Sequence, residues 1–410
     1  MKKSCRLLVF LMLIFRAAYA QQSGFFDVKG KEIIGPDGRP FLIKGINLGN
    51  WLVPEGYMFK FKHSSSPRLI DETFSQLLGP SRTADFWQNY LDHYISLDDI
   101  SYIKKTGANS IRIPFHYKLF TSETYLGSND STRGFRLLDR VISWCRELNL
   151  YVILDMHCAP GGQTGDNIDD SYGYPFLFEN PEDQQLCISI WEKIALHYKD
   201  EPTIIGYDLL NEPIAHYFDK DKLNPHLEPL YKRMISAIRK IDSQHIVFLG
   251  GAQWNSNFKV FGAPFDRKSV YTFHKYWTDT TQDVIQEYLD FQEKYQVPLY
   301  VGESGENKDE WINAFTQLLE KHNIGWHFWP YKKMESSSCM MSFPMPEGYQ
   351  QVIDFANAKR ESFADIREAA KAIDRDQLKD VFSALINSAQ FRNAKENPGY
   401  VKALNLKSYK

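Results

Sequence analysis

The sequence predicts an α/β protein with a single (β/α)8 barrel of the TIM type, and three observations lead to this prediction. Short apolar segments bounded by turn residues alternate with amphipathic segments along the 410-residue chain. The longest connections without such a pattern all follow apolar segments, as the loops of one barrel face do. The length also fits one barrel, because barrels span about 200 to more than 400 residues.

The pattern assigns the elements in chain order. A small N-terminal hairpin is expected at residues 26–41, with turn signals at Gly30 and Gly38. The expected strands are residues 42–48, 109–115, 151–157, 204–210, 245–250, 269–273, 298–302 and 325–329. The expected helices are residues 85–106, 135–149, 183–198, 230–241, a segment from 282, 310–322 and the closing helices in 363–388. The three long connections are residues 49–84, 158–180 and 331–349.

The first 20 residues are typical of a secretory signal peptide. A basic start, an apolar run at residues 7–15 and the motif Ala18-Tyr19-Ala20 predict cleavage after residue 20. The run is too short to span a bilayer, and no later stretch is long enough. The sequence therefore predicts a secreted protein, periplasmic or extracellular, with no membrane span. Its folded domain is expected at residues 21–390, followed by a polar tail at residues 391–410, and the expected state is a monomer.

Composition argues against several kinds of partner. The formal charge of −3 becomes −7 once the four basic residues of the signal peptide are removed. A mildly acidic chain argues against nucleic acid as a partner. Neither C-x-x-C nor H-x-x-x-H occurs, so no metal and no cofactor is expected. Buried free thiols are favoured over disulfides at the four remaining cysteines, which are Cys145, Cys158, Cys187 and Cys339.

Two expected strands end in a glutamate. Residues 204–213, Ile-Ile-Gly-Tyr-Asp-Leu-Leu-Asn-Glu-Pro, are expected to form a strand that stops at Glu212, because Pro213 cannot donate to a ladder. Alone, Asn-Glu-Pro could equally cap a helix. Residues 297–305, Val-Pro-Leu-Tyr-Val-Gly-Glu-Ser-Gly, end in the same way at Glu303. Parallel strands present their carboxyl ends on one barrel face, so the two glutamates are expected to share a pocket. Paired carboxylates are the groups that glycoside hydrolysis uses.

Polar or aromatic residues end most of the other strands. They are Arg112, His116, Asp155, His157, Asn211, Trp254, Asn255, His274, Tyr276 and Trp329. One such residue is more often structural, and that interpretation stays open for His116, Asp155 and Asn255. Convergence from seven strand ends favours a common site, because the centre of the face is shared.

Jointly, these motifs resemble glycoside hydrolase family 5, the cellulase-like barrels, between about residues 25 and 350. Residues 45–55, Gly-Ile-Asn-Leu-Gly-Asn-Trp-Leu-Val-Pro-Glu, are similar to the opening of the family's exo-β-1,3-glucanases. The other matching motifs are Arg112 in Ile-Arg-Ile-Pro-Phe, His157 in Leu-Asp-Met-His, Asn211-Glu212-Pro213, His274-Lys275-Tyr276, Gly302-Glu303 and Trp329. The resemblance implies that Glu212 is the acid/base and Glu303 the nucleophile. Its implied substrate-binding residues are Glu55, Arg112, His157, Asn211, Trp254, His274, Tyr276 and Trp329.

Electrostatics agrees with these implied roles. A retaining mechanism needs one ionised and one protonated carboxyl group about 5–5.5 Å apart. Arg112 and Tyr276 would favour the charged form of Glu303, and Glu212 beside that charge would hold its proton more tightly. Asn211 could bond the sugar 2-hydroxyl, and Trp329 could form the floor of the sugar subsite.

The predicted function is a secreted retaining β-glycosidase that acts on β-glucan or oligosaccharides, with exo action on β-1,3-glucan as the first choice. Endo action on β-1,4-glucan or mannan is the alternative, because residues 158–178 and 329–334 depart from the exo-glucanase pattern. Two alternatives belong to other classes. One is a sugar-binding protein without catalysis, and the other is a metal-dependent barrel hydrolase that uses Asp155, His157 and His274 as ligands.

Overall fold

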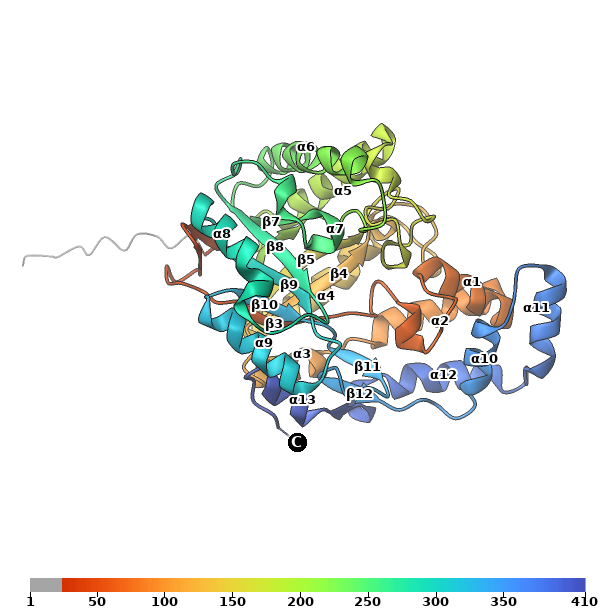
Figure 1. Cartoon of the computed structure of the whole chain (residues 1–410). Helices are drawn as coiled ribbons and strands as arrows, with labels where there is room; N and C mark the ends of the chain where they lie inside the picture. The colour runs from red at the N-terminus through yellow and green to blue at the C-terminus, as the bar shows by residue number, and fades with distance from the viewer. Residues whose placement is uncertain (1–23, 410) are drawn as a thin grey trace, which may run out of the picture.

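The structure is a computed structural model that describes residues 24–409, and their central feature is a closed barrel of parallel strands (Figure 1). In this part of the chain eight strands pair in chain order, and the last pairs with the first. They are β3 (Lys44–Asn47), β4 (Ser110–His116), β5 (Tyr151–Cys158), β6 (Ile204–Asp208), β7 (Ile246–Gly250), β8 (Ser269–Lys275), β9 (Leu299–Ser304) and β10 (Gly325–Phe328). Each strand overlaps a predicted one, so the predicted (β/α)8 barrel is confirmed.

Helices surround the barrel and continue beyond it. The helices that precede β10 are α1 (Pro67–Leu78), α2 (Pro80–His93), α3 (Leu97–Lys105), α4 (Arg133–Leu148), α5 (Pro181–Tyr198), α6 (Lys220–Arg239), α7 (Ala252–Asn255), α8 (Gln286–Tyr295) and α9 (Asp309–Lys321). Those that follow it are α10 (Gln350–Asn357), α11 (Phe363–Ala369), α12 (Leu378–Ser388) and α13 (Pro398–Ala403). Figure 1 shows α10, α11 and α12 beside α1 and α2, at the side of the molecule away from α8.

The predicted N-terminal hairpin lies at one end of the barrel. Its strands β1 (Asp27–Lys29) and β2 (Glu32–Ile34) pair antiparallel. Phe26 and Ile33 are buried there in one apolar cluster with strand residues such as Ile205 and Phe248. This cluster fills the barrel interior from the hairpin end, which leaves the carboxyl ends of the strands for a site.

Two predicted segments that precede β4 differ from the structure, and α6 begins ten residues before the predicted start at residue 230. The single helix expected at residues 85–106 is wrong, because the chain forms α2 and α3 with a break between them. Ser96 accepts a hydrogen bond from the Asp99 amide, and the Asp99 side chain accepts one from the Ser96 amide, so this capping box starts a new helix. The expected long loop at residues 49–84 contains α1, which starts with Pro67 in its first turn.

The last twenty residues also differ from the polar tail expected there. Strand β13 (Lys395–Glu396) pairs with β12 (Met341–Phe343), which pairs with β11 (Lys332–Met334) in the third long connection. Tyr400 is fully buried in α13, and its hydroxyl donates to the Trp329 carbonyl at 3.0 Å. This end of the chain therefore packs against the loop that follows β10.

The remaining sequence predictions concern cysteines and the membrane. Cys145, Cys158, Cys187 and Cys339 are all buried and free, as predicted. Between residues 24 and 409, no helix has the length and apolar character that a membrane span requires. The predicted signal peptide, residues 1–20, lies outside the described residues.

A buried ion pair holds β11 against the helices. Lys332 donates to Asp99 at 2.8 Å, and both side chains are fully buried. The same ammonium donates to the carbonyls of Tyr94 and Ala389, each at 2.7 Å. Burial lowers the pKa of Lys332, opposed by the attraction of Asp99. These contacts join the loop after β10 to α3 and to the end of α12.

Replacing Lys332 by Met should lower the free energy of unfolding by about 3–5 kcal/mol, because it leaves the Asp99 carboxylate buried without its cation. Lys371→Met is the matched control, since its ion pair with Glu368 is exposed. Denaturant titration should show a lower midpoint for Lys332→Met and an unchanged one for Lys371→Met. Equal midpoints for both variants would contradict this account.

Candidate active site

A cavity of about 710 Å³ opens at the carboxyl ends of the strands. Most of the predicted site residues line it, namely Glu55, His157, Glu212, Trp254, His274, Tyr276, Glu303 and Trp329. Glu303 lies within β9 and His274 within β8, where parallel pairing fixes their backbone. Strand β6 ends at Asp208 rather than at Glu212, which was expected to end it. Glu212 therefore comes from the segment that follows β6.

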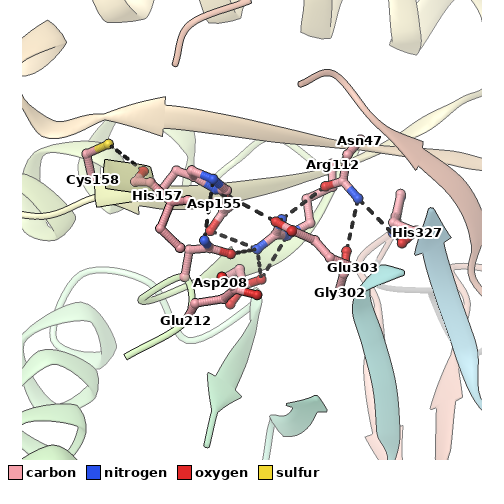
Figure 2. Close-up of polar contacts among 12 residues, drawn as sticks. Asn47, Arg112, Asp155, His157, Cys158, Asp208, Glu212, Gly302, Glu303 and His327 are labelled. Atoms are coloured by element: carbon pink, nitrogen blue, oxygen red, sulfur yellow. Dashed lines mark hydrogen bonds and ion pairs between the residues drawn. The ribbon is translucent and has the colours of Figure 1, made fainter. Parts of the chain in front are cut away.

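The guanidinium of Arg112 is fully buried below this cavity and contacts three carboxylates (Figure 2). It lies 2.9 Å from Asp208, 3.0 Å from Asp155 and 2.7 Å from Glu303. Asn47 accepts a further hydrogen bond from it at 3.0 Å. These partners come from different strands of the barrel, so one cation fixes side chains from several directions.

The three carboxylates have different surroundings. Burial raises the pKa of Asp155 and of Asp208 to about 7 each, and the charge of Arg112 opposes the shift. Glu303 instead has a donor at each oxygen, with Arg112 at 2.7 Å and the Tyr276 hydroxyl at 3.1 Å. Donors of this kind favour the ionised form of a carboxyl group. Of the three carboxylates that contact Arg112, Glu303 is therefore the one that has a donor at each oxygen and also lines the cavity.

Glu212 lies in a different environment. Burial raises its pKa to about 7, and the negative charge of Asp166 adds to the rise, whereas His157 and Arg112 oppose it. The sequence analysis attributed this effect to Glu303, and the structure corrects the cause. The result is a carboxyl group that keeps its proton near neutral pH.

His274 orients this carboxyl group. Its Nδ1 lies 2.8 Å from Glu212 Oε1, and its Nε2 lies 3.1 Å from the Asn255 amide nitrogen. Burial lowers the pKa of His274 to about 3, so the ring is neutral. With Nε2 accepting from Asn255, Nδ1 carries the proton and donates to Oε1. The other oxygen of Glu212 is then free to hold a proton.

The two glutamates are close together. One oxygen of Glu212, one oxygen of Glu303 and a ring nitrogen of His274 lie within 4.8 Å of one another. Retaining glycosidases have carboxyl groups about 5–5.5 Å apart, and inverting ones about 6.5–9.5 Å apart. This limit applies to one oxygen of each group, and it agrees with the shorter separation.

His157 and Trp329 form one wall of the cavity. Their rings stack with centroids 5.6 Å apart and planes 6° from parallel. Asp155 holds His157 Nδ1 at 2.8 Å, and burial lowers the pKa of this histidine to about 4. The Trp329 indole donates to the Tyr57 hydroxyl at 2.7 Å. The aromatic wall is thus fixed by hydrogen bonds at both ends.

Two predicted site residues lie beneath the cavity surface. Arg112 and Asn211 are fully buried and are not among its lining residues. Asn211 accepts from Arg112 at 2.9 Å, and its amide nitrogen lies 3.4 Å from His157 Nε2. Neither residue lines the cavity, and each contacts a residue that does, Glu303 for Arg112 and His157 for Asn211. His116 is also structural, because it pairs with Asp170 at 3.4 Å outside the cavity lining.

Several lining residues were not predicted from the sequence. Tyr57, Asp166, Trp277 and Glu306 all face the cavity. Tyr57, Trp277 and Glu306 lie within three positions of predicted residues, and this proximity in the sequence could have identified them as lining residues. Asp208 was also missed in the Arg112 cluster, although a carboxylate in an apolar strand needs a buried partner.

Strained backbone is concentrated around the cavity. Five lining residues other than glycine have a left-handed backbone, and they are Glu212, Gln253, Trp254, Trp277 and Glu306. Such a conformation costs about 1–3 kcal/mol per residue and persists where the surroundings impose it. This distribution agrees with a functional site.

The ligands of the metal-dependent alternative do not form one group in the described residues. Asp155 and His157 group with Glu303, whereas His274 groups with Glu212 and Glu303. Asp155 also has one oxygen on Arg112 and the other on His157. The side chains thus fit a hydrogen-bonded cluster better than the proposed three-ligand site.

Comparisons with known proteins identify the family of this chain. Residues 72–335 match the family profile described as cellulase (glycosyl hydrolase family 5). The chain is 30% identical to a β-xylosidase of Phanerodontia chrysosporium over 296 residues, covering 71% of this chain and 59% of that protein. It is 28% identical to Endoglucanase C of Acetivibrio thermocellus, and the alignment covers 61% of this chain and 88% of that protein. It is 30% identical to a glucan 1,3-β-glucosidase of Candida oleophila, covering 47% of each.

Solved structures show the same fold. An endogalactoceramidase matches 93% of this chain and 84% of its own, with a TM-score of 0.60 and 16% identity. A rutinosidase from Aspergillus niger matches 73% of this chain and 92% of its own, with a TM-score of 0.58 and 18% identity. The chain spans less than two thirds of the β-xylosidase and of the glucan 1,3-β-glucosidase. The family profile, which covers more than half of the chain, shows that this protein is a glycoside hydrolase and belongs to glycosyl hydrolase family 5.

Proposed function

We propose that this protein is a retaining β-glycosidase of β-linked glucan, with Glu303 as nucleophile and Glu212 as acid/base. The observation that carries the proposal is the pair itself. Two carboxyl groups share one cavity at short spacing, and their surroundings favour opposite protonation states.

The reaction follows from this arrangement in two steps. Glu303 attacks the anomeric carbon, the glycosidic C–O bond breaks, and Glu212 gives its proton to the departing oxygen. Glu212, now ionised, takes a proton from water, which attacks the glycosyl-enzyme and releases Glu303. His274 holds one oxygen of Glu212 throughout, so the other oxygen handles the proton.

The cavity walls supply contacts for a sugar. Trp329 presents an apolar ring for the sugar face. Glu55 is 6% exposed and lines the cavity, and its carboxylate makes no hydrogen bond to the residues that the structure describes. Burial and the nearby glutamates raise the pKa of Glu55 well above its usual value. A buried carboxyl group needs hydrogen-bond partners, and sugar hydroxyls would supply them.

Exo action on β-1,3-glucan is our first choice of specificity. The loops after β3, β9 and β10 are tied together, because Glu306 accepts from Tyr57 at 3.1 Å and pairs with Lys333 at 2.8 Å. This connection closes one side of the cavity, which favours binding of the end of a glucan chain. A relative named glucan 1,3-β-glucosidase agrees with this choice.

Endo action on β-1,4-glucan or mannan is the second candidate. The relative named Endoglucanase C favours it, because the alignment covers 88% of that protein. Linkage-defined oligosaccharides distinguish the two, since an exo enzyme releases one sugar at a time from a chain end. A sugar-binding protein without catalysis would release none. Export by the signal peptide expected at residues 1–20 is part of the proposal, and N-terminal sequencing of the mature protein tests it.

The rate should fall as pH rises through about 7, because the Glu212 pKa lies near that value and its proton is needed in the first step. Asp166→Asn should move this alkaline limb to lower pH, since removing a negative charge favours ionised Glu212. The profile of kcat/KM against pH measures the shift. Asp290→Asn, on α8 and away from the cavity, is the charge-matched control. An unmoved limb in Asp166→Asn contradicts the assigned cause.

Azide should separate the two glutamates with an activated aryl glycoside. In Glu303→Ala, azide attacks from the vacated side and gives the inverted glycosyl azide. In Glu212→Ala the glycosyl-enzyme still forms on Glu303, and azide then gives the retained product. NMR of the anomeric centre reads the outcome. The opposite pattern would reverse the two roles.

Chelation should leave the rate unchanged, because the proposed steps use only carboxyl groups and water. The measurement is the hydrolysis rate before and after dialysis against EDTA, with zinc added back as the control. A loss that zinc restores would favour the metal-dependent alternative with Asp155, His157 and His274.

A further inference from the structure

We propose that Trp277 forms an additional sugar-binding subsite at the rim of the cavity, which takes a sugar unit beyond the one that Glu303 attacks. The inference rests on the proposed function, because it assigns a longer oligosaccharide to the same site. Trp277 lies two residues after the end of β8 and lines the cavity.

The ring of Trp277 is exposed but fixed. Its residue is 74% exposed, which is unusual for so large an apolar side chain. Its indole N–H donates to the Glu306 carbonyl at 3.0 Å, and the Tyr276 ring lies 5.4 Å from its centroid at a 40° tilt. The hydrogen bond fixes the edge of the ring, so its orientation is set before any ligand arrives.

The backbone connects this ring to the reacting centre. Trp277 has a φ of 54°, a left-handed conformation that a tryptophan rarely adopts. The preceding residue, Tyr276, donates to Glu303 at 3.1 Å. The strained peptide thus places an open aromatic ring next to the residue that holds the nucleophile.

The surroundings of Trp277 fit a sugar. A sugar ring has an apolar C–H face and a polar edge, so its site combines an aromatic ring with hydrogen-bonding groups. Thr278, Glu306 and Tyr57 line the same cavity and supply such groups. Glu306 is itself held by Lys333 at 2.8 Å, which keeps its carboxylate in place.

An exposed aromatic residue need not bind a sugar, and a second such residue in this protein shows why. Phe363 is 81% exposed at the start of α11, and it is not among the residues that line the active-site cavity. Figure 1 shows α11 at the edge of the molecule, far from β8 and β9. Scattered exposed apolar residues need no function. Phe363 is therefore a suitable control for Trp277.

The test is kcat/KM for a series of glucose oligomers of increasing length, from the disaccharide upward, in β-1,3 and β-1,4 linkage. The wild type and the variants Trp277→Ala, Trp277→Phe and Phe363→Ala are compared. The wild type should gain in kcat/KM when the chain first reaches Trp277. Trp277→Ala should lose about tenfold for that length and longer ones, equivalent to about 1.4 kcal/mol. The shorter oligomers should keep their rates, and Trp277→Phe should recover part of the loss.

Two outcomes would overturn the subsite. An equal loss at every length shows that Trp277 only supports the structure, and no loss at any length shows that no sugar uses the ring. Both outcomes leave the proposed function intact, because the wild type still hydrolyses the series. If the wild type hydrolyses nothing, the proposed function fails instead. Calorimetric titration of the same oligomers into wild type and Trp277→Ala then decides the subsite separately.

Discussion

The buried guanidinium of Arg112 is the interaction on which the site depends. A charge without water needs charged and hydrogen-bonded partners, or its burial would cost several kcal/mol. The barrel supplies them from four other strands, through Asn47, Asp155, Asp208 and Glu303. A shift in the register of any of these strands would separate a carboxylate from its cation. The same contacts therefore stabilise the closed barrel and fix the direction of Glu303.

The two cavity glutamates differ because Arg112 contacts Glu303 directly and does not contact Glu212. Glu303 receives a direct contact from Arg112 and another from Tyr276, so its charge is stabilised at both oxygens. Glu212 has no such contact, and burial keeps it protonated to about pH 7. His274 adds a hydrogen bond without adding charge, because burial keeps the ring neutral. Glu212 thereby keeps its proton while Glu303 lies between two donors, which is the difference that the proposed acid and nucleophile require.

The sequence predicted those parts of the fold and site that local signals determine. Apolar runs identified the barrel strands, and glutamates at their ends identified Glu212 and Glu303. Features that depend on tertiary contacts could not be predicted. The burial of Asn211 beneath the cavity depends on where β6 ends. The raised pKa of Glu212 depends on how deeply the folded chain buries its side chain. Trp277 has no pattern of its own, because its exposure depends on the loop that carries Glu306.

The C-terminal segment shows why a barrel alone would not complete the site. Trp329 follows β10, and the loop beyond it leaves the barrel and pairs instead in the small sheet of β11, β12 and β13. Tyr400 donates to the Trp329 carbonyl, and Lys332 binds Asp99 deep among the helices. On the cavity side, Tyr57 accepts from the Trp329 indole. The ring that lines the cavity is thus held by residues from two distant parts of the chain, so the last helix contributes to the geometry of a cavity that it does not line.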